Sequence, residues 1–152
     1  MNLLTPQALT GAQIEFVIPS AAKLIHVSVQ AVGMTANQNL GLRIGPSGGV
    51  ESSGYDAFLH RNGTTVANLP LTSAFPLAAF INSTNRQHGA VTLVLMDALT
   101  NTWALMSILA ETGASNINLA AGTKAIAGVL NKLQLISLTG TFSVGSAGVQ
   151  WV

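Results

Sequence analysis

Short runs in which apolar and polar side chains alternate recur along this chain. The cleanest run, residues 25–31, reads IHVSVQA, and residues 91–95 read VTLVL. Alternation with a period of two predicts β-strands, because successive side chains of a strand point to opposite faces. Further runs lie at residues 14–18, 40–44, 103–109, 133–135 and 149–151.

Glycine or proline separates these runs at intervals of roughly 8 to 12 residues, which is typical of sandwiches and barrels. The turn-forming residues 97–101 predict a hairpin over 90–110. Residues 121–135 are rich in Ala and Leu, but Gly122 and Gly128 weaken a helix there. We expect an all-β fold, a jelly-roll-like antiparallel β-sandwich forming a single domain.

The first twelve residues differ from the rest, with a proline and little alternation, and they indicate an N-terminal arm (1–12) ahead of the sandwich domain (13–152). The arm has no charged side chain. Its leucines would gain by burial against a neighbouring molecule, and proline lowers the entropy cost of docking in an extended form. The expected partner-binding residues are Leu3, Leu4, Pro6 and Leu9.

The small number of charged residues indicates which kinds of partner this chain can bind. Only 7% of the residues are charged and 49% are hydrophobic, whereas ordinary domains carry about 25% charged residues. So few charges cannot cover a free monomer, and much of the surface is expected to face other subunits in a homo-oligomer or a larger shell. The six basic residues are scattered, so no direct contact with nucleic acid is expected.

No membrane segment or secretory signal is expected either. The most apolar region, 91–110, is interrupted by Asp97, Thr100 and Asn101, and a helical span needs about 20 uninterrupted apolar residues. The N-terminus lacks a basic stretch followed by an apolar run. Cysteine is absent, which excludes disulfides and thiolate metal sites.

The glycine-rich stretch GPSGGVESSGY, residues 45–55, is the strongest candidate for a binding loop. A phosphate loop needs Gly-Lys-Ser/Thr after its glycines, but Val50 and Glu51 follow here, and the dinucleotide fingerprint is also missing. The stretch is therefore predicted to be a tight corner that leads into a strand at Tyr55. Its structural residues would be Gly48, Gly49, Gly54 and Tyr55.

Residues that carry chemistry are sparse. Glu51 and Asp56 could hold a calcium ion, but such a site needs six to eight oxygen ligands, so solvation of a loop is favoured. His26, His60 and His88 have no zinc-ligand spacing, and no Gly-x-Ser-x-Gly elbow occurs. We expect no catalytic residue, metal site or cofactor, and hence no enzyme.

Aromatic side chains could form a stacking platform for sugars or bases, but on alternating strands they are expected to anchor the core. Trp103, at the start of the return strand of the hairpin, is the clearest core anchor. The residues in question are Trp103, Trp151, Phe16, Phe75, Phe80 and Phe142.

Four groups of residues, spread over 14–152, resemble a family of β-sandwich domains from tailed-bacteriophage virions. They are Ile18-Pro19-Ser20 with Lys23 and Ile25; Ile44-Gly45 with Ser47-Gly48-Gly49, Glu51 and Gly54-Tyr55; Asn101-Thr102-Trp103; and Leu130, Lys132 and Leu133. Such domains often lie at the distal end of longer tail-fibre or appendage proteins. Here only a short segment precedes the first strand, so a stand-alone protein without a fibre shaft is expected.

The resemblance implies a non-enzymatic structural protein located in the virion. A capsid decoration (cement) protein is the first interpretation, a trimer that would suit the threefold positions of an icosahedral shell, with the major capsid protein or another virion protein as its partner. The apolar arm is expected to dock on an adjacent subunit or on the capsid. The alternative is a tail-fibre or appendage module that binds a glycan or protein of the host surface. A third reading, a small hydrolase or lectin-like enzyme acting on the cell envelope, lacks a recognisable carboxylate pair or triad.

Overall fold

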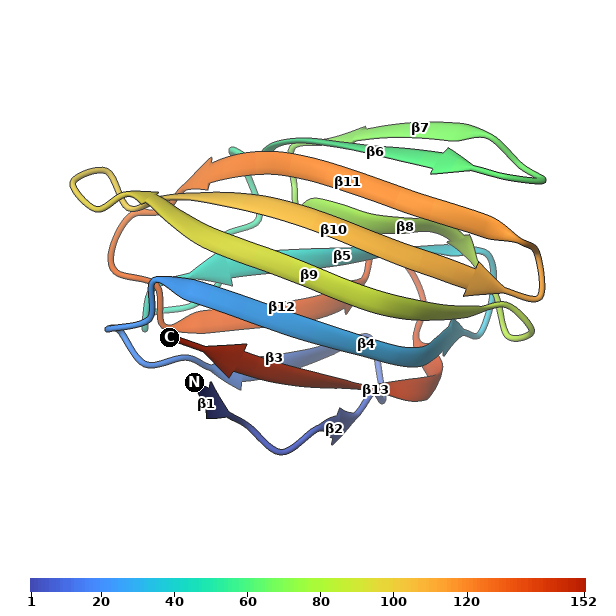
Figure 1. The fold of residues 1–152 in the computed structure, drawn as a ribbon, viewed down its shortest axis with the longest axis horizontal. Helices are drawn as coiled ribbons and strands as arrows, with labels where there is room; N and C mark the ends of the chain where they lie inside the picture. The colour runs from blue at the N-terminus through green and yellow to red at the C-terminus, as the bar shows by residue number, and fades with distance from the viewer.

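The computed structural model describes residues 1–152 and consists of antiparallel β-strands without a helix (Figure 1). The predicted all-β fold is confirmed, and the Ala- and Leu-rich segment 121–135 forms the end of one strand, a loop and the start of the next. The strands are β1 (Asn2–Leu3), β2 (Gln7–Ala8), β3 (Gln13–Val17), β4 (Leu24–Met34), β5 (Gln38–Gly45), β6 (Asp56–Asn62), β7 (Ala67–Leu71), β8 (Phe75–Ile81), β9 (Arg86–Asp97), β10 (Thr102–Thr112), β11 (Asn116–Ala125), β12 (Lys132–Ser137) and β13 (Phe142–Trp151).

The strands form two sheets that pack face to face as a β-sandwich. The large sheet has nine strands in the order β1-β13-β4-β9-β10-β11-β6-β7, with β2 also paired to β13. The small sheet has four strands in the order β3-β12-β5-β8. In Figure 1 the long strands β4, β9, β10 and β11 lie in front of the small sheet.

The winding of the chain is jelly-roll-like. Strand β4 pairs with β13 in the large sheet, β5 with β12 in the small sheet, and β6 with β11 in the large sheet again. Early strands thus meet late strands in reverse order, and the pairs alternate between the sheets. This nesting is the pattern of a double-stranded ribbon wrapped into a jelly roll.

The core lies between the sheets and comprises a cluster of 30 buried residues. Its members come from the alternating runs, such as Ile25, Val27 and Val29 of β4, because the inward side of each strand carries the apolar set. Trp103 is 2% exposed and belongs to this cluster, which confirms its predicted role. Phe16, Phe75 and Phe142 are buried with it.

One aromatic prediction is wrong. Phe80, at the end of β8, is 45% exposed instead of buried. Its backbone has φ of 58°, in the left-handed region that side-chain-bearing residues rarely adopt. This turn of the backbone carries the ring out of the core, which local alternation could not indicate.

The predicted hairpin over 90–110 is present as β9 and β10, which pair along nearly their whole length. Its turn is fixed by the carboxylate of Asp97, which accepts hydrogen bonds from the Leu99 N–H and the Thr100 hydroxyl. These two bonds lower the pKa of Asp97. A register shift between Thr102 and Trp103 follows the turn, and the Trp103 ring is buried in the core.

The arm lies along the edge of the sandwich. Strands β1 and β2 pair with β13, so the arm hydrogen-bonds to what would otherwise be an open sheet edge. Leu9 is 2% exposed and belongs to the core of its own chain, and Leu4 packs partly buried against that core. The expectation that Leu9 contacts a partner is therefore wrong, whereas Leu4 is only half-buried and its partner contact stays a prediction. Leu3 and Pro6 are exposed, and their role as partner contacts stays a prediction.

Candidate functional site

The most unusual surface is the outer side of the large sheet over β6, β9, β10 and β11. Large apolar side chains point to solvent there, and Met106 and Ile108 are each more than 60% exposed. We call this surface the apolar face and define it by Phe58, Val94, Met106, Ile108, Ile117 and Leu119.

Strand register places these side chains in rows across the sheet. Ile108 pairs with Leu119 on one side and with Ala90 on the other. Met106 lies between Ala121 and Thr92 in the same way, and Ala121 pairs with Phe58. A shallow apolar hollow of about 370 Å³ lies between these rows. The rows form one continuous surface because each pair lies on adjacent strands.

The middle of the apolar face carries no charged side chain, and the three histidines lie around it. His60 of β6 pairs with Leu119, His88 of β9 pairs with Ala110, and His26 of β4 pairs with Thr92. Each ring nitrogen Nδ1 has its own partner: Thr92 for His26, Asn68 for His60 and the Ala31 N–H for His88. The structure contains no cluster of three or more potential metal ligands.

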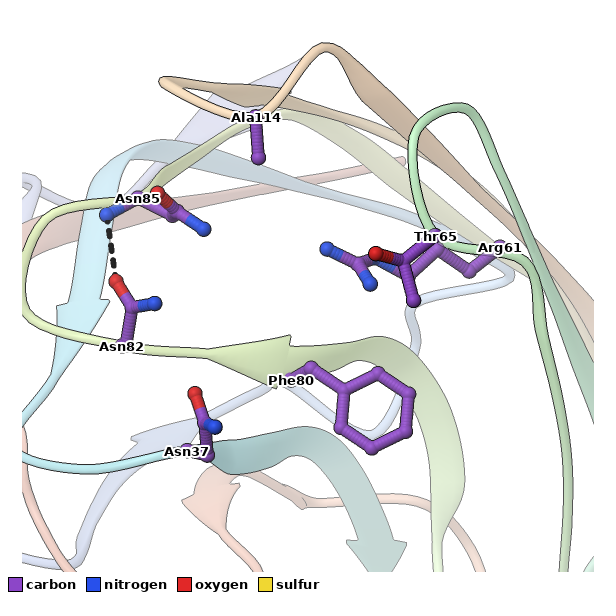
Figure 2. Close-up of a pocket in the computed structure, with 7 residues that line it drawn as sticks. All are labelled: Asn37, Arg61, Thr65, Phe80, Asn82, Asn85 and Ala114. Atoms are coloured by element: carbon purple, nitrogen blue, oxygen red, sulfur yellow. Dashed lines mark hydrogen bonds between the residues drawn. The ribbon is translucent and has the colours of Figure 1, made fainter.

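A second candidate site is a polar hollow at one end of the sandwich, with a volume of about 310 Å³ (Figure 2). Four connecting loops meet there: β4–β5, β6–β7, β8–β9 and β10–β11. Loops gathered at one end of a rigid sandwich are a common place for binding sites. We call it the loop-end hollow; it is lined mainly by Asn37, Arg61, Thr65, Phe80, Asn82 and Asn85.

A buried ion pair forms the wall of the loop-end hollow. The Arg61 guanidinium donates from Nε and Nη2 to both carboxylate oxygens of Glu111, with a shortest distance of 2.8 Å. Glu111 also accepts a hydrogen bond from Nδ2 of Asn85 at 2.7 Å. Both charged side chains are almost fully buried. Each needs the opposite charge of the other, because an unpaired charge inside a protein is strongly destabilising.

The glycine-rich stretch 45–55 forms the corner between β5 and β6 at the opposite end, as predicted. Gly49 and Gly54 have φ of 144° and 73°, conformations that favour glycine. A Cβ atom at Gly48 would meet no neighbouring atom, so the space around this position does not require glycine. The Tyr55 hydroxyl accepts a hydrogen bond from the Ile44 N–H and donates to the Glu51 carbonyl, each at 2.9 Å. The corner is therefore tied to the strand that precedes it.

Glu51 and Asp56, the two carboxylates considered as calcium ligands, do not form a shared cluster of oxygen ligands. Glu51 forms an ion pair with Lys124 and accepts a hydrogen bond from the Ala127 N–H. Burial raises the pKa of Glu51, but the bonds from Lys124 and Ala127 outweigh it and leave the pKa below its ordinary value. Asp56 is exposed at the start of β6. Both oxygens of Glu51 thus have partners within the chain.

The other two residues predicted to have a structural role, Pro19 and Trp103, lie in a turn and in the core. Pro19 follows β3, and its carbonyl accepts a hydrogen bond from the Ala22 N–H, which closes a turn. Trp103 lies in the core, as described above. No helix of the structure has the length and apolarity needed to cross a membrane.

Sequence reasoning missed both candidate sites. The Arg61–Glu111 pair joins residues 50 positions apart, and no local pattern connects them. The apolar face had one signal, the apolar residues at both alternating positions of residues 103–109. Such a run indicates a strand with two apolar faces.

Comparison with known proteins gives no family assignment: no family model, curated protein or solved structure matches the chain.

Proposed function

We propose that this protein is a non-enzymatic structural protein of a tailed-bacteriophage virion, whose copies form a trimer that decorates the capsid. The apolar face is the single observation that carries the assembly role. The virion setting rests on the sequence motifs that resemble phage β-sandwich domains, among them Ile18-Pro19-Ser20 and Asn101-Thr102-Trp103.

The size of the apolar face supports a role as a subunit interface. Six large side chains exposed to between 38% and 63% present on the order of 500 Å² of apolar surface, the upper range for a free monomer. A standard interface buries about 800 Å² per partner, of which roughly 60% is apolar. The apolar face thus supplies about the whole apolar content of one such interface.

A second copy of this chain is the occupant that fits best. A partner of opposite charge would need charged groups to meet, and the middle of the face has none. Interfaces between identical subunits are the most apolar class and need no charge complementarity. Around a threefold axis, the apolar face of each subunit would pack against a different patch of the next subunit, because the contacts in a trimer are heterologous. Trimers also match the threefold positions of an icosahedral shell.

Sedimentation velocity with charge substitutions tests the interface. Met106→Lys and Ile108→Lys each place a charge in the middle of the face, so the oligomer should dissociate to 15.6 kDa monomers. The matched control is Val17→Lys, on the small sheet, where Val17 is 61% exposed. Circular dichroism should show unchanged strand content in all three. A wild-type monomer, or face variants with the wild-type mass, would contradict the proposal.

The place in the virion is tested separately by electron microscopy of particles labelled with antibody to this protein. Label over the head supports the decoration role. Label confined to the tail tip would replace it with the second candidate, a receptor-binding module of a fibre or appendage. Particles without label would overturn both.

A further inference from the structure

The loop-end hollow has the attributes of a small-ligand site, independently of the apolar face. Its volume of about 310 Å³ is at the lower end of the range for ligand pockets, about 300 to 1,000 Å³. It is built at the end of the sandwich where β6, β8 and β10 finish, whereas the apolar face lies on the side of the large sheet. A ligand there would be bound by loops on a rigid frame.

Several polar groups point into the hollow without a partner of their own. The ion pair with Glu111 uses Nε and Nη2 of Arg61, which leaves Nη1 without a hydrogen-bond partner. Figure 2 shows the Arg61 guanidinium pointing into the hollow. Oδ1 of Asn82 accepts from the N–H groups of Thr84 and Asn85, at 2.9 and 2.8 Å. Those bonds fix the amide, so that Nδ2 of Asn82 is a preoriented donor.

An exposed aromatic ring lies among these polar groups. The N–H of Phe80 donates to Oδ1 of Asn39 at 3.2 Å, which stabilises the left-handed backbone conformation that turns the ring outward. The guanidinium carbon of Arg61 lies 5.5 Å from the ring centroid. Backbone conformations of this kind concentrate at functional positions. The ring supplies an apolar surface beside fixed hydrogen-bond donors.

The charge of the hollow selects the class of ligand. Arg61 is already matched by three hydrogen bonds to the Glu111 carboxylate, so the lining has no net charge to attract an anion. The other polar lining groups are amides and a hydroxyl, from Asn37, Asn82, Asn85 and Thr65. Neutral donors and acceptors beside an aromatic ring are complementary to a molecule with many hydroxyls on an apolar ring.

We propose that the loop-end hollow binds a neutral saccharide. One pyranose ring would place its C–H surface against Phe80, whose ring face is electron-rich. Its hydroxyls would accept from Nη1 of Arg61 and Nδ2 of Asn82 and exchange hydrogen bonds with the amide of Asn37. The site is open and small, so affinity for a monosaccharide is weak and each contact accounts for a large part of it.

The test is titration of the isotopically labelled full chain, followed by amide NMR shifts. The probes are methyl glucoside, methyl galactoside and N-acetylglucosamine, with glucuronic acid as the charged counterpart. At least one neutral sugar should give saturable shifts in residues 35–39, 61–65, 80–85 and 113–115. Glucuronic acid should bind more weakly than methyl glucoside.

Variants decide whether the hollow is responsible. Asn37 is exposed, so Asn37→Ala should leave the fold intact and weaken binding about tenfold, the effect of one lost hydrogen bond. Phe80→Leu keeps an apolar side chain without the aromatic face and should also weaken binding about tenfold. Ser52→Ala, at the opposite corner, is the control and should bind like the parent.

Three results would overturn the proposal: no saturable shift with any neutral sugar, affinity unchanged in both variants, or tighter binding of glucuronic acid. The oligomer state of Met106→Lys is a separate readout. Failure of the saccharide site therefore leaves the proposed assembly role standing, and the reverse also holds.

Discussion

At the scale of single residues, this protein places much of its scarce charge inside. It has eleven charged side chains, six basic and five acidic, and three of them, Arg61, Glu111 and Lys124, are buried. Each of the three is paired, Arg61 with Glu111 and Lys124 with Glu51. Because these three charged side chains are buried, the surface carries even fewer charges than the composition indicates.

Tyr55 provides a residue-scale prediction. Burial raises its pKa to about 12, whereas an unfolded tyrosine ionises near 10. Above pH 10 the unfolded chain releases a proton that the folded chain retains, so the free energy of unfolding should fall between pH 10 and 12. The loss is on the order of 2 kcal/mol and is absent below pH 10.

Urea unfolding at a series of pH values measures this loss, and Tyr55→Phe is the control because it lacks the ionising hydroxyl. The chain has a single tyrosine, so tyrosinate absorbance reports this one group in the folded protein. An absorbance titration centred near pH 10 would show that the hydroxyl is not protected by burial.

At the scale of elements, the N-terminal arm protects a sheet edge. Strand β13 would be an edge strand without β1 and β2, and an open edge is a template for pairing with other chains. The arm also adds Leu9 to the core. It is therefore part of the folded domain, and only its outward side chains remain free for a neighbour.

The two kinds of leucine in the arm should behave differently. Leu9→Ala removes a fully packed side chain and should lower the free energy of unfolding by about 2 to 5 kcal/mol. Leu3 is 60% exposed, so Leu3→Ala should change stability by less than about 0.5 kcal/mol. Denaturant unfolding of both variants measures the difference. Equal effects would mean that the arm is detached from the sandwich in solution.

At the scale of the whole molecule, the two sheets have different outer surfaces. The outer side of the small sheet carries the Glu15–Lys132 ion pair between β3 and β12, at 2.9 Å, and the side chain of Arg43. The large sheet carries the apolar face. One side of the sandwich is thus more polar than the other, a difference that the proposed oligomer would use by burying the apolar face.

Salt dependence tests this division. Association through an uncharged apolar face should not weaken as sodium chloride is raised, because no ion pair is screened. Sulfate should strengthen association, since it is excluded from apolar surface. Sedimentation equilibrium at several salt concentrations gives the dissociation constants. A dissociation constant that rises steeply with sodium chloride would point to a charged interface elsewhere on the molecule.

From the sequence alone one could predict most of the long strands, the hairpin and the glycine corner, because these depend on local periodicity and on backbone preferences of neighbouring residues. The strands β7, β8 and β11 and the short arm strands β1 and β2 carried no such signal. The sequence also identified Trp103 as a core residue. It did not determine which side of a doubly apolar strand faces inward. In β10, Ser107 is buried while Met106 and Ile108 are exposed, an outcome contrary to the polarity of the side chains.

Both candidate sites depend on contacts between segments that are distant in the sequence. The orientation of β10 is fixed by the strand register and by Trp103, Leu105 and Leu109, which all point into the core. Once they are inside, a strand with period two must expose Met106 and Ile108. The loop-end hollow likewise depends on the meeting of four loops that are distant in sequence. Nonlocal packing, which the order of residues does not display, created both surfaces.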